Sequence, residues 1–219
     1  MKSGTNLTVV FSFNAWGKMQ GDVVDAIRNI DKNHWIVVSG IHTGDNPATG
    51  LSYLPKYSDN KLLYTFHFYD PHVFTFQGDR MWPDAQFGGI PFPYDEKRMP
   101  QIPQWAKGTW IEDALINYPV EGTIAALTKT LDQISKFAKQ RNVPLFCGEF
   151  GVMMWTCPPE DRIRYYQFVR EALEIRNIPW IMWDYFGQCG IFKKPEGRSN
   201  FKTGINVELV RALGLTPPR

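Results

Sequence analysis

Hydrophobic and polar positions form two kinds of pattern along this chain. Short apolar runs rich in β-branched and aromatic residues are typical of buried strands, and apolar residues at every third or fourth position are typical of helices. The first pattern predicts strands at Leu7–Phe13, Trp35–Ser39, Leu62–Tyr69, Leu145–Phe150 and Pro179–Tyr185. The second predicts helices at Gly21–Asp31, Glu121–Gln140, Pro159–Arg176 and Val207–Leu213. Strands that alternate with helices predict right-handed βαβ units, and therefore an α/β fold with a parallel sheet.

The segment from about residue 70 to residue 120 interrupts this alternation. It is rich in Pro, Gly and aromatic residues, and it is far longer than an ordinary connection between a strand and a helix. A connection of this length is usually functional, so we expect it to shape or cover a site. No internal repeat, low-complexity tract or linker divides the chain, and we expect one domain over residues 1–219.

Aromatic residues make up 15% of the 219 residues, with eight Trp and fifteen Phe. A large core is the simplest explanation. Many of the rings nevertheless lie in polar, Pro/Gly-rich stretches, where a core needs them less: Phe74, Phe76, Trp82, Trp105, Trp110 and Trp155. Flat rings that stack on the apolar faces of sugars explain this placement better.

Charge and cysteine usage exclude several classes of partner. The net charge of +2 is too small for a nucleic-acid or anionic-membrane surface, and no run approaches the ~18 apolar residues that span a bilayer. Residues 1–6 lack the apolar run of a signal peptide. Cys147 lies in a predicted buried strand, and a bridge between Cys157 and Cys189 is conceivable. No Cys/His cluster has zinc spacing and no Gly-rich phosphate loop is present, so we expect no metal and no cofactor.

Chemically active residues gather at the ends of three predicted strands. Glu149 closes one strand within Gly-Glu-Phe-Gly, His67 and Tyr69 end another, and Trp183 lies near the end of the last. The C-terminal ends of parallel barrel strands meet at one face, so these side chains should lie together. A carboxylate beside His, Tyr and Trp is typical of a site that cleaves sugars.

This ordered set resembles glycoside hydrolase family 5, the retaining cellulases, mannanases and related β-glucanases. The matching pieces are His67-x-Tyr69, Glu149 in Gly-Glu-Phe-Gly, and Trp183, and the tract Phe66–Gly78 followed by Trp82 is similar to members that act on β-glucans. The resemblance covers most of residues 9–213. It implies an endoglucanase-type retaining hydrolase of β-glucan polysaccharide or oligosaccharide, such as cellulose, and family members are generally exported.

The resemblance also implies a role for each residue. Glu149 would be the nucleophile that forms a glycosyl-enzyme intermediate, and Tyr69 would hydrogen-bond to it. His67 would hold the acid or the sugar hydroxyls, and Trp183 would form the floor under the sugar. Asn14 and Trp82 would bind the substrate. Trp155, one of the rings in the Pro/Gly-rich stretches, is a further expected substrate-binding residue. The alternative for His67, Tyr69 and Trp183 is a purely structural place in the core.

One part of the family pattern is missing. The family's general acid/base is the Glu of an Asn-Glu-Pro tract at a strand end, and here Asn14 is followed by Ala15 and Trp16. Alanine cannot transfer a proton, and such help is typically worth about 10²–10⁴-fold in rate. A non-hydrolytic glucan-binding pseudoenzyme is therefore the alternative function, with an interaction scaffold as a weaker one. Five other carboxylates are alternatives for the acid, although each is more simply explained as a surface charge: Asp70, Asp79, Glu112, Asp113 and Asp184.

If Leu7–Phe13 corresponds to the family's fourth strand, the chain holds about five of the eight units of a TIM barrel. Such a partial (truncated) barrel leaves open sheet edges and an apolar interior in contact with water. Three arrangements would resolve this: a self-associating half-barrel, a fragment that needs its missing half, or an open α/β sheet. We expect the first, a homo-oligomer that covers the barrel edges.

Overall fold

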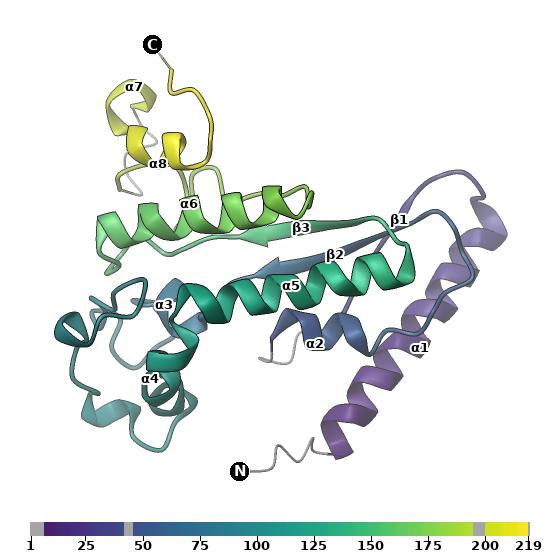
Figure 1. The fold of residues 1–219 in the computed structure, drawn as a ribbon, viewed down its shortest axis with the longest axis horizontal. Coiled ribbons are helices and arrows are strands. Elements are labelled where there is room, and N and C mark those ends of the chain that lie inside the picture. The colour runs from purple at the N-terminus through teal and green to yellow at the C-terminus, as the bar shows by residue number, and fades with distance from the viewer. Residues whose placement is uncertain (1–6, 42–45, 195–199, 219) are drawn as a thin grey trace. The chain divides into compact units, whose positions relative to one another are not determined.

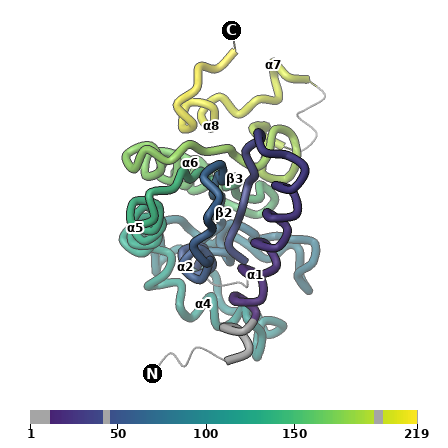
Figure 2. The backbone as a smooth tube through the Cα atoms, turned by 90° about the vertical axis from the view of Figure 1, so that its right-hand side faces the viewer, coloured from purple at the N-terminus to yellow at the C-terminus, as the bar shows by residue number. Residues whose placement is uncertain are grey.

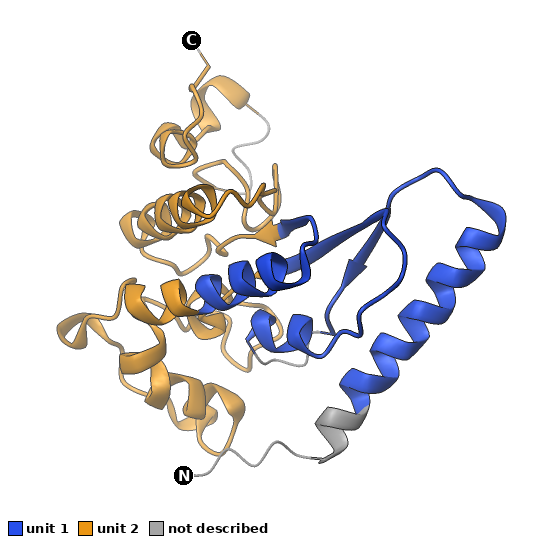
Figure 3. Ribbon diagram, turned by 45° about the vertical axis from the view of Figure 1, so that its right-hand side comes forward, with its two compact units in different colours: residues 1–67, 130–148 blue, residues 68–129, 149–219 orange. Residues whose placement is uncertain are grey.

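The computed structural model describes residues 7–41, 46–194 and 200–218 (Figure 1). Residues 1–6, where we found no signal-peptide pattern, lie outside this range. The chain divides into two compact units, and each is assembled from two stretches (Figure 3). Unit 1 comprises residues 1–67 and 130–148, and unit 2 comprises residues 68–129 and 149–219. The expectation of a single domain stays a prediction.

In the part of the chain that the structure describes, three strands form a sheet in the order β1-β2-β3: β1 (Ile36–Ser39), β2 (Leu62–Phe68) and β3 (Leu145–Phe150). β1 and β2 are parallel, with Ile36 opposite Leu62, and the arrows of β2 and β3 point the same way in Figure 1. β2 is apolar at almost every position and largely buried, as expected for a parallel strand covered on both faces. Three of the five predicted strands are thus confirmed.

The predicted strand Leu7–Phe13 is wrong, because these residues begin a 24-residue helix, α1 (Leu7–Ile30). Phe13 is fully buried and stacks on Tyr53, with ring centroids 4.6 Å apart. Gly17 lets the helix approach the rest of unit 1 closely, since a Cβ at this position would lie 2.5 Å from Pro55. Packing at helical spacing has overridden the local strand preference of a β-branched run.

Unit 1 is completed by α2 (Pro47–Ser52) and by the part of α5 (Ile124–Arg141) from residue 130 onward. β2 lies between α1 on one side and α5 on the other (Figure 2). The predicted apolar stripe of α5 is buried at Leu131, Ile134 and Phe137. Among the described residues, none of the helices has the length and hydropathy that crossing a membrane requires.

Unit 2 contains the long segment between β2 and α5, and this segment is more regular than we predicted. It holds α3 (His72–Thr75), two 3-10 turns, η1 (Glu96–Arg98) and η2 (Gln104–Ala106), and α4 (Trp110–Glu121). The Thr109 hydroxyl caps α4 by accepting the Ile111 N–H at 3.2 Å.

The remainder of unit 2 follows β3. It consists of α6 (Pro159–Ile175), α7 (Phe201–Gly204) and α8 (Val207–Ala212). The predicted strand Pro179–Tyr185 is not a regular strand. Its Trp183 N–H still donates to the Phe150 carbonyl at 2.8 Å, but the Asp184 carboxylate then accepts the Gly187 N–H at 2.7 Å and turns the chain.

A buried ion-pair cluster ties the long segment to α6 within unit 2. Asp161 is fully buried and accepts two hydrogen bonds from the Arg98 guanidinium, at 2.8 and 3.1 Å. Arg164 also pairs with Asp161 and donates to the Phe92 carbonyl at 2.7 Å. These contacts hold residues 92–98 against the start of α6.

Candidate active site

The centre of the candidate site is a hydrogen bond in unit 2 that the sequence predicts. Tyr69 immediately follows β2, and Glu149 is the penultimate residue of β3. The Tyr69 hydroxyl donates to Glu149 Oε2 at 2.7 Å. Burial, reinforced by this carboxylate, raises the pKa of Tyr69 above its ordinary value of 10, so the phenol remains a proton donor. The pair therefore consists of a fixed donor and an oriented carboxylate.

The backbone of Trp183 is hydrogen-bonded to β3, the strand that carries Glu149. Its N–H donates to the carbonyl of Phe150, the residue after Glu149. Gly151 makes this approach possible, because a Cβ at that position would lie only 2.2 Å from the Trp183 carbonyl oxygen. The Trp183 side chain is 52% exposed, so its indole keeps a free surface. The predicted residue is thus presented to solvent beside the end of β3.

A buried arginine that sequence reasoning missed holds the loop after Trp183. Arg162, on α6, donates through Nε to the Val152 carbonyl at 3.0 Å, and through Nη2 to the carbonyls of Cys189 and Gly190 at 2.8 and 2.6 Å. The Tyr166 hydroxyl adds a bond of 2.6 Å to the Cys189 carbonyl. The sequence pattern that could have predicted it is that Arg162 lies four residues before Tyr166, and therefore on the same buried face of α6.

Cys189 lies near two carboxylates at this site. Burial raises its pKa to about 12, Arg162 lowers it, and Asp184 and Glu149 raise it further. Asp184 has one buried carboxylate oxygen, Oδ1, for which the described residues provide no partner. The conceivable bridge to Cys157 is not formed, because both cysteines are buried free thiols.

Two further predicted sugar-binding residues, Trp82 and Trp155, lie in different surroundings. Trp82 is only 8% exposed and packs against Trp105 and Trp110, and its sugar-binding role stays a prediction. Trp155 is half-buried, its indole N–H donates to Gln188 at 2.9 Å, and the Arg80 guanidinium lies 5.0 Å from its ring centroid. A sugar-binding role for Trp155 stays a prediction.

Two further predicted residues, His67 and Asn14, belong to unit 1. His67 is exposed near the end of β2, and its role stays a prediction. Asn14 and Ala15 are exposed in the interior of α1. Neither residue ends a strand, because the predicted strand is part of a helix, and the sugar-binding role of Asn14 stays a prediction.

Asp70, one of the possible replacement acids, follows Tyr69 in unit 2. Burial raises its pKa to about 7, and the charge of Glu121 contributes. Its backbone carbonyl accepts a hydrogen bond of 2.9 Å from the Tyr165 hydroxyl. Across the part of the chain that the structure describes, no three His, Cys, Asp or Glu side chains are placed to hold a metal ion.

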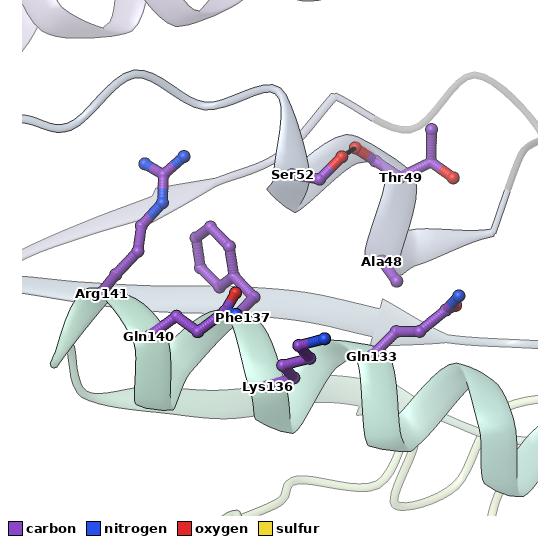
Figure 4. Close-up of a pocket in the computed structure, with 8 residues that line it drawn as sticks. All are labelled: Ala48, Thr49, Ser52, Gln133, Lys136, Phe137, Gln140 and Arg141. Carbon is purple, nitrogen blue, oxygen red and sulfur yellow. Dashed lines mark hydrogen bonds between the residues drawn. The ribbon is translucent and has the colours of Figure 1, made fainter.

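Unit 1 has a polar groove of its own between α2 and α5, with a volume of about 390 Å³ (Figure 4). It is lined by two basic and no acidic side chains, together with hydroxyl, amide and apolar groups: Ala48, Thr49, Ser52, Gln133, Lys136, Phe137, Gln140 and Arg141. The Arg141 guanidinium covers the Phe137 ring at 4.8 Å and donates to the Pro55 carbonyl at 2.9 Å. None of the predicted catalytic residues lines this groove.

Comparison with known proteins supports the resemblance seen in the motifs. The family model Cellulase (glycosyl hydrolase family 5) matches residues 3–188. Endoglucanase 3 of Fibrobacter succinogenes is 27% identical over 186 residues, which cover 81% of this chain and 28% of that protein. Endoglucanase C of Acetivibrio thermocellus is 27% identical over 177 residues, which cover 78% of this chain and 49% of that protein. The chain thus spans between about a quarter and a half of the length of these relatives.

Solved structures show the same fold. The structure of Thermotoga maritima Cel5A in complex with cellobiose superimposes with a TM-score of 0.66 at 21% identity, over 91% of this chain and 54% of that one. Another endoglucanase structure gives a TM-score of 0.68 at 18% identity, over 92% of this chain and 55% of that one. The fold is therefore α/β with a parallel sheet, similar to those enzymes.

The relatives named above are hydrolases, and they lend no support to the alternative of a non-hydrolytic glucan-binding protein. The family model extends over most of the chain, from residue 3 to residue 188, and includes every motif on which the resemblance was based. The chain belongs to glycosyl hydrolase family 5, the cellulase family.

Proposed function

We propose that this chain carries the nucleophile of a retaining β-glucan hydrolase of endoglucanase type, and that Glu149 is that nucleophile. The observation that carries the proposal is the 2.7 Å hydrogen bond from the Tyr69 hydroxyl to Glu149 Oε2, at adjoining strand ends. A phenol that stays protonated stabilises the carboxylate anion and fixes its orientation. The partial TIM barrel remains our interpretation of the fold, with three strands among the described residues in place of the expected five.

The reaction would proceed in two displacements. A Glu149 oxygen attacks the anomeric carbon, the bond to the leaving-group oxygen breaks, and a second carboxyl protonates that oxygen. The resulting glycosyl ester is then hydrolysed by water, which gives the sugar its new hydroxyl and returns Glu149 to its carboxylate form. The exposed Trp183 indole would support the ring that reacts. The proton donor is unassigned; Asp184 is the carboxylate that shares the surroundings of Cys189 with Glu149.

The nucleophile assignment is tested by Glu149→Gln, with Glu171→Gln as the control because Glu171 pairs with Arg170 on the surface of α6. We expect Glu149→Gln to abolish the release of reducing ends from carboxymethylcellulose and mixed-linkage glucan, and Glu171→Gln to leave it unchanged. In Glu149→Ala, azide should restore turnover by attacking in place of the carboxylate, with a glycosyl azide of inverted configuration as the product. Full activity of Glu149→Gln would contradict the assignment, and glucan binding by the unmodified chain without any cleavage would contradict hydrolysis.

We also propose that the chain associates with itself through unit 1. α1 carries a stripe of exposed apolar side chains at helical spacing, namely Met19, Val23, Ile27 and Ile30. In the described sheet, β1 is an edge strand that pairs only with β2. An apolar helix face and an open sheet edge in one unit are typical of a surface that is covered in the assembled state.

The association is tested by light scattering of the unmodified chain and of a Val23→Lys/Ile27→Lys double variant. We expect a mass of at least a dimer for the unmodified chain and of a monomer for the double variant. Asp25→Lys, also on an exposed position of α1, is the control and should keep the larger mass. A monomeric unmodified chain at tens of micromolar would overturn the proposal.

A further inference from the structure

A row of aromatic side chains leads away from the candidate nucleophile within unit 2. Tyr69, the partner of Glu149, meets the edge of Phe76 at a centroid distance of 5.2 Å. His72 stacks on Phe76 at 4.1 Å with an interplanar angle of 19°. Trp110 then meets His72 at 5.7 Å. The end of β2 is thus connected to the first residue of α4 through ring contacts alone.

The outer end of this row is exposed and supported from beneath. His72 is exposed and the Trp110 side chain is 51% exposed, although both belong to ordered helices. Trp82, which is buried, packs edge-on against Trp110 at 6.1 Å. The Thr109 cap fixes the backbone at the start of α4. Trp110 is therefore held in place while it keeps a large apolar surface in contact with water.

The geometry of the two outer rings suits a sugar. Their planes meet at 64°, so they form a corner in which one ring can serve as a floor and the other as a wall. A pyranose has apolar C–H faces that pack on aromatic rings and a rim of hydroxyls that needs hydrogen-bond partners. Asp113 is exposed in the first turn of α4, next to the corner in sequence, and Glu112 precedes it. Carboxylates accept hydrogen bonds from hydroxyls and disfavour an anionic ligand.

We propose that His72 and Trp110 form an outer subsite that binds one sugar unit of a β-glucan chain, away from the bond that is cleaved. This inference rests on the proposed function, since it assumes that a glucan occupies the site at Glu149. It assigns to Trp110 the direct contact that the sequence predicted for Trp82. It also gives the long segment between β2 and α5 a function, namely to extend the length of glucan that the chain holds.

The test uses the Glu149→Gln background, in which the ligand is not cleaved, and calorimetric titration with cello-oligosaccharides of increasing length. We expect Trp110→Ala to weaken the binding of the longest oligosaccharides about 10-fold, the effect of about 1.4 kcal/mol of ring contact. The binding of cellobiose should be unchanged, because a short ligand does not reach an outer subsite. Trp110→Phe and His72→Phe keep a ring and should lose less than Trp110→Ala.

The matched control is Trp35→Ala, because Trp35 is 58% exposed, lies in unit 1 and belongs to no part of the row. Circular dichroism of each variant establishes that it is folded, and Trp110→Phe provides the comparison if Trp110→Ala is not. If Trp110→Ala binds long oligosaccharides as tightly as Trp35→Ala does, the subsite is refuted while the proposed function stands. If Trp110→Ala weakens the binding of cello-oligosaccharides of all lengths equally, the position of the subsite away from the cleaved bond is refuted. If the background binds no cello-oligosaccharide, the proposed function and the subsite both fail.

Discussion

The variant Arg162→Met is expected to lose about 3–5 kcal/mol of the free energy of unfolding. Methionine has a similar length and fills much of the same space, but it cannot donate to the carbonyls of Val152, Cys189 and Gly190. A buried polar group that is left without a partner costs about 1–3 kcal/mol, and three acceptors depend on this one side chain. The loss is therefore larger than that of a typical single substitution.

The measurement is urea denaturation followed by tryptophan fluorescence, with Arg211→Met as the control. Arg211 forms its ion pair with Glu208 on the surface of α8, so its replacement should change stability by less than about 1 kcal/mol. The loop that Arg162 holds also carries Trp183, so we expect weaker glucan binding in Arg162→Met at temperatures where it is still folded. Equal midpoints for the two variants would show that Arg162 does not hold the loop.

Asp70→Asn is expected to stabilise the chain above pH 7 and to flatten the dependence of stability on pH. Burial, with the charge of Glu121, raises the pKa of Asp70 from 3.8 to about 7. Between these two values the folded chain keeps the Asp70 proton and the unfolded chain does not. Stability must therefore fall as pH rises from about 4 to about 7, because the folded state binds more protons. Asparagine is neutral at every pH and removes this loss.

For Asp70→Asn we expect the free energy of unfolding to rise by about 2 kcal/mol at pH 8 and to change little at pH 4. The expected gain is smaller than the full pKa shift implies, because the Asp70 side chain is partly solvated. Urea denaturation at pH 4.5, 6 and 8 measures this difference. The control is Asp113→Asn, whose exposed side chain should leave the pH dependence as it is. A pH dependence in Asp70→Asn as steep as that of the unmodified chain would mean that another group causes it.

The strand pattern predicted β1, β2 and β3 because each is a short, largely apolar run. The same rule failed for Leu7–Phe13, because Phe13 and Gly17, four residues apart, pack on one face of a helix. In Pro179–Tyr185 the Trp183 N–H still bonds to the Phe150 carbonyl, but the Asp184 side chain then bonds to the Gly187 backbone and turns the chain. Side-chain contacts of this kind are not part of a hydrophobic pattern.

The candidate site was predictable as far as it depends on strand ends. The Tyr69–Glu149 hydrogen bond follows from two neighbouring strands that end at the same edge. Which tryptophan is exposed does not follow from the sequence, because Trp82 and Trp110 occur in similar surroundings along the chain and only packing makes one of them buried. The contribution of Arg162 could not be predicted, because its three acceptors are backbone carbonyls. Every residue has a backbone carbonyl, so the sequence does not indicate which ones accept.

Gly151 limits how a site of this kind can diversify. Any larger residue there would push the backbone at Trp183 outward, so the main chain sets how closely residue 183 approaches the end of β3. Substitutions in the peripheral loops, where side chains are exposed, leave this crossing in place and are therefore the less disruptive way to change the contacts with a ligand.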